Sequence, residues 1–146
     1  MSETEKFTDS RITELSKIVE KLLKKRGYFI LEYPNKSNWK AVFKAFFHGN
    51  LTFPHDIFPK DLRSKKSIAK NTLPFFNYHP NKMEKILLDH GFSIIEKRSV
   101  SNLRSGPLKK LLSTDFLITL ERIFQKPLAL LSFGPSIFLL ARKRGS

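Results

Sequence analysis

The chain has 146 residues, the size of one domain, and 40% of them are hydrophobic. This apolar content excludes a disordered protein, because disordered chains lack the apolar area that offsets the entropy of ordering. Lys and Arg number 27 against 13 Asp and Glu, and the net charge of +14 favours anionic partners such as nucleic acid, acidic membrane or phosphorylated substrates. There is no cysteine, and the four histidines form no metal-binding pair, so we expect no metal site.

The first residues predict neither a signal peptide nor an ordered element. Residues 1–9 are polar and lack both a basic head and an apolar core, so we expect them to be disordered. The longest apolar stretch, residues 128–138, is interrupted by Ser, Gly and Pro and is too short to span a bilayer. These features predict a cytoplasmic protein without a transmembrane segment.

The first two elements are predicted to be a helix and a buried strand. Apolar residues recur at helical spacing from Ile12 to Leu23, with Asp9 or Ser10 as the cap and Gly27 as the stop. Residues 28–33 are apolar on both sides, which predicts a strand buried on both faces. A helix, a glycine and a buried strand form one unit of a layered α/β fold.

A second helix and a long irregular segment are predicted next. Ser37 is the expected cap, and the helix ends at Gly49. Its expected core-facing stripe consists of Trp39, Val42, Phe43 and Phe46. Residues 50–74 are irregular and basic, which is typical of a binding loop or of a mobile segment.

The second half of the chain predicts two helical regions and two strands. Pro80 begins a helix that stops at Gly91, and a strand follows over residues 92–100. A helical stretch runs from Pro107 to Pro127 with a break near residues 113–115, and a last strand covers 136–141. The inward residues expected in that stretch are Leu108, Leu111, Leu112, Phe116, Leu120, Ile123 and Phe124.

Three segments resemble class I S-adenosylmethionine-dependent methyltransferases. Residues 24–36, KKRGYFILEYPNK, are similar to the segment in which a helix ends, a glycine turns the chain and the fifth strand begins. Residues 77–92 resemble the next helix and its entry into a strand, and residues 136–143 resemble the closing strand. The resemblance implies a partial Rossmann-like sheet with helices on both faces, in which the last strand runs antiparallel between the other two.

The resemblance covers about residues 10–143, but only the C-terminal half of such an enzyme. The family binds S-adenosylmethionine in its N-terminal half, at a glycine-rich turn whose backbone approaches the ligand. None of the six glycines here lies within four residues of another. We therefore expect residues 1–146 to form one domain that is a fragment, half of a split enzyme or a degenerate relative, and that binds no cofactor in isolation.

Candidate site residues lie where the first predicted strand ends. Ligands of open α/β sheets sit outside the carboxyl ends of the strands, so Tyr33, Pro34 and Asn35 lie at the rim of the expected cleft, and Tyr33 and Asn35 are candidates for substrate binding. Tyr78 is a third candidate, in the segment that the resemblance places near the substrate side. Asn35 could equally serve only to turn the chain. His79 is the candidate general base, or else a structural residue at a helix N-terminus. Glu32 either points into the cleft or pairs with a lysine.

Two classes of function compete. The resemblance implies the substrate-side half of a methyltransferase that acts on a small molecule and needs the missing half for activity. The alternative is a non-catalytic basic module that binds anionic partners such as nucleic acid. Five basic residues with aromatic neighbours could hold single-stranded nucleic acid, or form only a solvated loop; they are Lys60, Arg63, Lys65, Lys66 and Lys70.

Two further surfaces bear on partners. The outer edge of the strand at 28–33 would lack a neighbour, which predicts a homo-oligomer, a complementary N-terminal half or aggregation. Residues 107–133 could line a hydrophobic substrate groove, touch a membrane or belong to the core.

Overall fold

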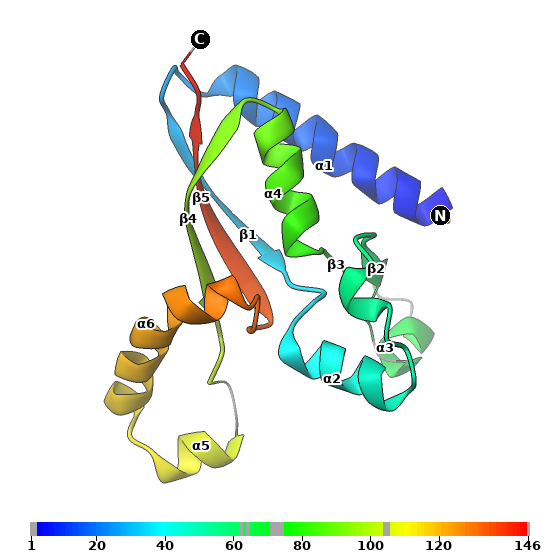
Figure 1. Ribbon diagram of the computed structural model, residues 1–146, viewed down its shortest axis with the longest axis vertical. Coiled ribbons are helices and arrows are strands. Elements are labelled where there is room, and N and C mark those ends of the chain that lie inside the picture. The colour runs from blue at the N-terminus through cyan, green and yellow to red at the C-terminus, as the bar shows by residue number, and fades with distance from the viewer. Residues whose placement is uncertain (1–2, 62, 64, 71–74, 104–105, 146) are drawn as a thin grey trace.

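The computed structural model describes residues 3–61, 63, 65–70, 75–103 and 106–145 and is a mixed α/β structure with an antiparallel sheet (Figure 1). The elements are α1 (Glu3–Leu22), β1 (Tyr28–Pro34), α2 (Trp39–Phe47), the 3-10 helix η1 (Phe53–His55), β2 (Lys60–Asp61), α3 (Lys65–Ala69), β3 (Phe76–Asn77), α4 (Pro80–Asp89), β4 (Phe92–Val100), α5 (Gly106–Leu111), α6 (Thr114–Leu130) and β5 (Ser136–Lys143). Within these described residues, no helix is both long and apolar enough to cross a membrane.

The main sheet has the strand order β1-β5-β4. Strand β5 is antiparallel to both neighbours, with Leu139 opposite Leu31 on one side and Ile137 opposite Ser99 on the other. The three predicted strands and the central antiparallel position of the last one are therefore confirmed. No neighbouring strands of this sheet are parallel in the described residues, so the expected Rossmann-like sheet is not shown there.

Helices α1 and α4 cover one face of the sheet (Figure 1). Phe92, Ile137 and Leu139 are fully buried there, because Met83 and Leu87 of α4 pack against them. Helix α1 contributes a partly buried stripe of Ile12, Val19 and Leu23. We call this side the covered face.

The opposite side of the sheet, which we call the open face, has little cover. Ile30 is 67% exposed and Tyr28 is 55% exposed. Helix α6 approaches only from the β4 side, where Lys126 pairs with Glu96 at 3.2 Å. The expectation that residues 28–33 are buried on both sides is wrong for the described residues, and helices on both faces are found only in part, because α6 contacts the sheet at β4.

Several helix ends differ from the sequence prediction. Helix α1 already begins at Glu3, so most of residues 1–9 are helical and neither Asp9 nor Ser10 is a cap. Asn38, and not Ser37, caps α2, because its side chain accepts a hydrogen bond from the Ala41 N–H at 3.1 Å.

The predicted signals in the second half are mostly confirmed. Pro80 is the first residue of α4, and Gly91 follows that helix with a φ of +79°. The break near residue 113 is confirmed, since Ser113 caps α6. Pro127 lies inside α6 and does not end it, at the cost of one backbone hydrogen bond.

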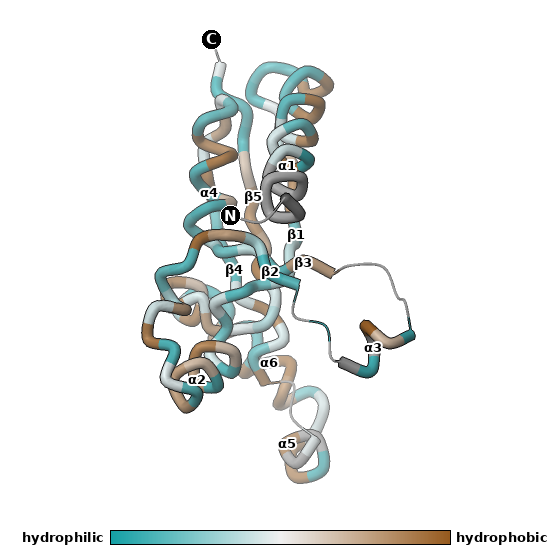
Figure 2. The backbone as a smooth tube through the Cα atoms, turned by 90° about the vertical axis from the view of Figure 1, so that its right-hand side faces the viewer, coloured by the Kyte–Doolittle hydropathy of each residue, from teal (hydrophilic) through white to brown (hydrophobic). Residues whose placement is uncertain are grey.

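Many apolar side chains of α2, α5 and α6 are exposed. Figure 2 shows the hydrophobic residues of α2 and α6 in brown along these helices. The inward stripes predicted for these helices are therefore wrong in large part, because most of their members are exposed, although the Trp39 ring stacks on Phe133. The exposed members of the two predicted stripes are Trp39, Phe43, Phe46, Leu111, Phe116, Ile123 and Phe124. Periodicity predicted the stripes correctly, but it does not indicate what covers them.

Candidate functional site

Two adjoining pockets lie where β1 ends and β5 begins, and together we call them the carboxyl-end groove. The larger has a volume of about 470 Å³ and the smaller about 220 Å³. Asn38 and Pro135 line both. The other lining residues are Glu32, Tyr33, Pro34, Asn35, Phe75, Asn77 and Ser136 in the larger pocket, and Trp39, Lys40, Ser101 and Asn102 in the smaller. This is the end of a sheet at which α/β proteins bind ligands.

Asn35 holds the turn that precedes β5. Its side-chain amide donates to the carbonyls of Ser132 and Gly134, the latter at 2.8 Å, and its Oδ1 accepts from the Ser37 N–H at 2.9 Å. The residue is 1% exposed. Because its amide hydrogens and its carbonyl oxygen are engaged by the chain, Asn35 primarily shapes the groove wall.

The end of β4 holds the same turn from the other side. The Gly134 N–H donates to Ser99 Oγ at 2.8 Å, and Ser99 Oγ donates to Asn102 Oδ1 at 2.6 Å. Asn102 in turn donates to Glu121 of α6 through its backbone N–H at 3.0 Å and its side chain at 2.8 Å. The sequence analysis missed this network, whose only signal is the polar residue Ser99 inside a strand.

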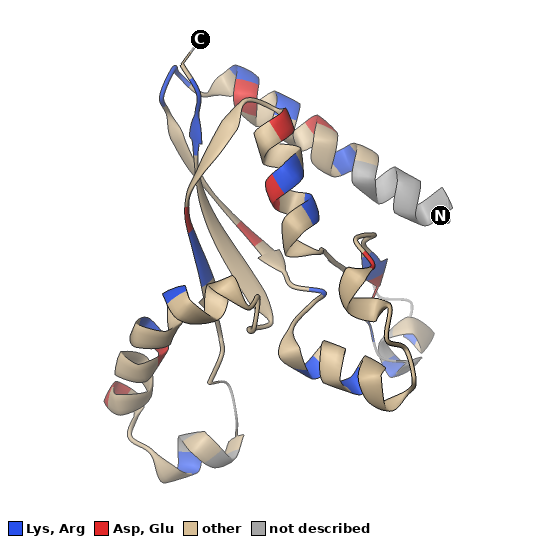
Figure 3. Ribbon diagram, in the orientation of Figure 1, with Lys and Arg blue, Asp and Glu red and all other residues tan. Residues whose placement is uncertain are grey.

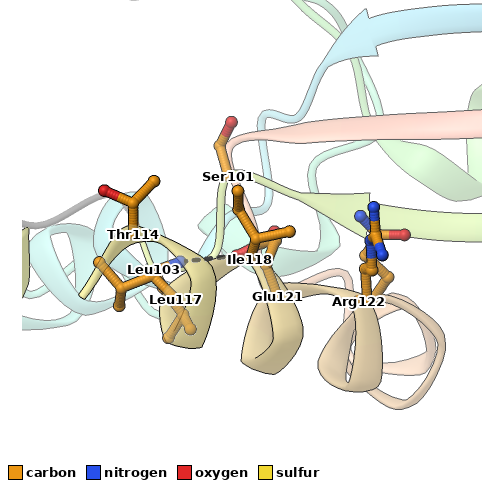
Figure 4. A pocket seen from close by; sticks show the side chains of 8 residues that line it. Ser101, Leu103, Thr114, Leu117, Ile118, Glu121 and Arg122 are labelled. Carbon is orange, nitrogen blue, oxygen red and sulfur yellow. Dashed lines mark hydrogen bonds between the residues drawn. The ribbon is translucent and has the colours of Figure 1, made fainter. Parts of the chain in front are cut away.

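A third pocket, of about 640 Å³, lies between α6 and the turn after β4 (Figure 4). Glu121 and Arg122 contribute its charged groups, and Leu103, Leu117 and Ile118 its apolar surface. Glu121 Oε2 accepts from the Leu103 N–H at 3.1 Å. Because Glu121 fixes the backbone of this turn, its carboxylate is a structural anchor in this arrangement.

The structure brings Tyr33, Asn35 and Tyr78 together at the end of β1. The Tyr78 N–H donates to the Pro34 carbonyl and the Tyr78 carbonyl accepts from the Lys36 N–H, both at 2.9 Å. The Tyr33 hydroxyl is buried without a hydrogen-bond partner among the described residues. Burial, and then the nearby charge of Glu84, raises the pKa of Tyr33, so this hydroxyl stays protonated.

Glu32 takes one of its two expected positions. It is exposed and lines the larger pocket of the groove. It therefore places a carboxylate at the groove wall, on the same side of the strand as the open face.

His79 caps α4. Its Nδ1 accepts from the Asn81 N–H at 3.2 Å, so its Nε2 carries the proton and donates to the Pro54 carbonyl at 3.0 Å. Burial lowers the pKa of His79 and the Lys36 charge acts in the same direction, although the Pro54 hydrogen bond opposes them. The ring is neutral and both nitrogens are engaged, which is the geometry of a helix cap.

Lys36 is a buried cation that the sequence analysis did not single out. Its Nζ lies 2.6 Å from Asp56 Oδ2 and donates to the carbonyls of Asp56 at 2.8 Å and Phe58 at 2.6 Å. Burial acts to raise the pKa of Asp56, but the Lys36 hydrogen bond and charge, with the Phe58 N–H, outweigh it and lower the pKa. Lys36 therefore fixes the loop of residues 53–59 beside the groove.

The basic segment after this loop is partly engaged by its own chain. Lys60 Nζ lies 5.6 Å from the centre of the Phe53 ring, and Arg63 pairs with Asp61 at 2.6 Å. Lys66 and Lys70 are exposed. The side chain of Lys65 lies outside the described residues.

The glycine turn before β5 leaves no open backbone for a ligand. A backbone cradle needs open space beside glycines that lie together, and the space at Gly134 is closed by Ser99 and Asn102, whose oxygens would lie 2.6 Å from an added Cβ. No group of three or more His, Asp or Glu that could hold a metal occurs in the described part of the chain. A scan against protein-family models found no match, and a search of the curated proteins found none.

Proposed function

We propose that this chain is the C-terminal, substrate-side half of an S-adenosylmethionine-dependent methyltransferase that acts on a small molecule. The observation that supports the proposal is the strand order β1-β5-β4. In this order β5 lies between β1 and β4 and runs antiparallel to both. The family resemblance implies this order, and few simple connections produce it, because the last strand must insert between two earlier ones.

The open side of the sheet supports the need for a second half. In the described structure β1 pairs with β5 on one side only, and its other edge pairs with no strand. Ile30, on the open face beside that edge, is largely exposed. In this proposal the missing half extends the sheet from β1 and covers the open face, and a second copy of this chain is the alternative occupant of the edge.

The carboxyl-end groove is the proposed site for the methyl acceptor. Glu32 and Asn77 contribute polar side chains to its larger pocket, and Phe75 contributes an exposed ring. Such a site acts mainly by holding the acceptor in line for transfer. We assign no general base, because His79 would first have to release the Pro54 carbonyl or the Asn81 N–H.

The alternative function is a non-catalytic basic module that binds polyanions. The structural roles of His79 and Asn35 favour it, because they remove two of the four candidate site residues from direct chemistry in this arrangement. It differs from the methyltransferase proposal in requiring neither a second half nor a cofactor.

Calorimetry with S-adenosylmethionine tests the proposal. The chain alone should show no binding, and a mixture with a polypeptide that supplies the glycine-rich N-terminal half should bind with a dissociation constant of about 1 µM to 1 mM. An Ile30→Lys variant should fail to restore binding in the mixture, and an equally exposed Leu22→Lys control should restore it. Micromolar binding by the chain alone, or no binding in the mixture together with RNA binding at about 50 mM salt, overturns the proposal.

A further inference from the structure

Helix α2 presents four aromatic side chains to solvent. Trp39, Phe43, Phe46 and Phe47 are 42%, 56%, 61% and 69% exposed, and α2 contains no buried residue. We call these four residues the aromatic face. Single exposed apolar residues are common on protein surfaces, but a contiguous apolar patch marks a contact site.

The fold fixes the aromatic face outward. The small side of α2, with Ala41 and Ala45, lines a pocket beside Phe53 of η1. At the start of the helix the Trp39 N–H donates to the Phe133 carbonyl at 3.0 Å, and the two rings stack at 5.4 Å. The orientation of α2 is therefore set by contacts on its other side and at its N-terminus.

The charges around the aromatic face are all positive. Lys40 and Lys44 are the charged residues of α2, and Figure 3 shows blue and no red on this helix. Lys40 Nζ lies 5.6 Å from the centre of the Trp39 ring. No Asp or Glu occurs between Glu32 and Asp56, and the whole chain carries a charge of +14.

We propose that α2 docks on an anionic membrane surface, with the aromatic face inserted at the interface. Aromatic rings, Trp above all, favour the headgroup region of a bilayer, and lysines beside them bind anionic lipid phosphates. The lack of any acidic residue within α2 favours an anionic bilayer over a protein surface of mixed charge. The proposal goes beyond the proposed function and does not depend on it.

Trp39 is the only tryptophan and lies within the proposed contact, so its fluorescence reports the docking directly. The chain is titrated with phosphatidylcholine vesicles that contain either no phosphatidylserine or about 30% of it. We expect a blue shift of the Trp39 emission with the anionic vesicles only. The double variant Phe43→Ser/Phe47→Ser should weaken vesicle binding about tenfold or more, and Lys40→Gln/Lys44→Gln should weaken it by about fivefold or more.

Matched controls on α1 make the result specific, because that helix lies on the covered face at a distance from α2 (Figure 1). Leu15→Ser/Leu22→Ser removes two exposed apolar side chains, and Lys17→Gln/Lys21→Gln removes the same charge. Both should bind vesicles like the unchanged chain. If circular dichroism shows that the Phe43→Ser/Phe47→Ser variant is unfolded, the proposal is judged on the Lys40→Gln/Lys44→Gln variant and on the shift of the Trp39 emission. Absent binding, equal binding to neutral vesicles, binding without a Trp39 shift or equal losses in the α1 controls each overturn the proposal.

Discussion

The covered and open faces of the sheet are built from alternate residues of the same strands, but only the covered face is complete. Leu139 is fully buried under α1 and α4, whereas Ile30 on the other side of the sheet is 67% exposed. Residues 28–33 are apolar on both sides, a composition suited to a strand with two covered faces. The apolar composition of β1 therefore suits a strand with packing on both faces, whereas the described chain packs against only one of them.

The largest expected effect comes from truncating adjacent leucines that point to opposite faces. Leu139→Ala should lower the free energy of unfolding by about 2–5 kcal/mol, because it leaves a cavity in the covered face. Leu140→Ala should cost about 1 kcal/mol or less, since its half-buried side chain lies on the open face. Urea unfolding measures both, and equal losses would contradict the difference between the faces.

A smaller loss of stability is expected in the loop of residues 53–59, which Lys36 holds. Lys36→Met should lower the free energy of unfolding by about 1–3 kcal/mol, because two carbonyls and Asp56 lose their partner. The exposed Lys60→Met is the control and should change stability by less than about 0.5 kcal/mol.

Lys36→Met should also change how the free energy of unfolding depends on pH. The pKa of Asp56 is lowered from 3.8, so its stabilising contribution is present above about pH 4 and is lost as pH falls through the folded-state pKa. In Lys36→Met this loss should be smaller. An unchanged acid profile in the variant would show that Lys36 does not hold the Asp56 carboxylate ionised.

His79→Asn should have a modest effect, because asparagine retains a cap acceptor for α4 and loses only the bond to Pro54. We expect about 1 kcal/mol or less at pH 7. The pKa of His79 is lowered from 6.5, so the stability associated with the neutral ring is present above that pH and falls as protons bind the unfolded chain. The variant should lose this dependence below pH 6.5, and His48→Asn should retain it.

The smallest effect on stability is expected at the open face. Ile30→Lys should leave the free energy of unfolding within about 0.5 kcal/mol, because the side chain is mostly exposed. It should nevertheless reduce self-association, measured by light scattering at about 10 µM, since a charge on an edge strand opposes pairing. A monodisperse monomer before the substitution would show that the open edge does not recruit a second copy.

The three strands of the main sheet and several helix boundaries could be predicted because their signals are local. Gly27 and Pro34 bracket the apolar run of β1, and Pro80 and Gly91 bracket α4. The candidate residues Tyr33, Asn35 and Tyr78 lie near one another at the end of β1, and their proposed role in substrate binding stays a prediction. The central position of β5 came from the family resemblance and not from periodicity.

The remainder depends on partners distant in sequence. Lys36 meets Asp56 across 20 residues, and nothing in the composition around either residue indicates the pairing. The aromatic stripe of α2 was recognised, but its burial was wrongly inferred, because periodicity defines a face and not its environment. The role of His79 was also ambiguous, since only the positions of Pro54 and Asn81 show how its nitrogens are engaged.

The central strand of the sheet is the last to be synthesised. Strands β1 and β4 pair with β5 along most of their length and not with each other. The two outer strands are separated by more than 50 residues in the sequence, and only residues 136–143 join them into one sheet. The three-stranded sheet therefore cannot form before β5 is available to pair with both outer strands. A stop codon just before Ser136 would abolish the whole sheet and not only one of its strands.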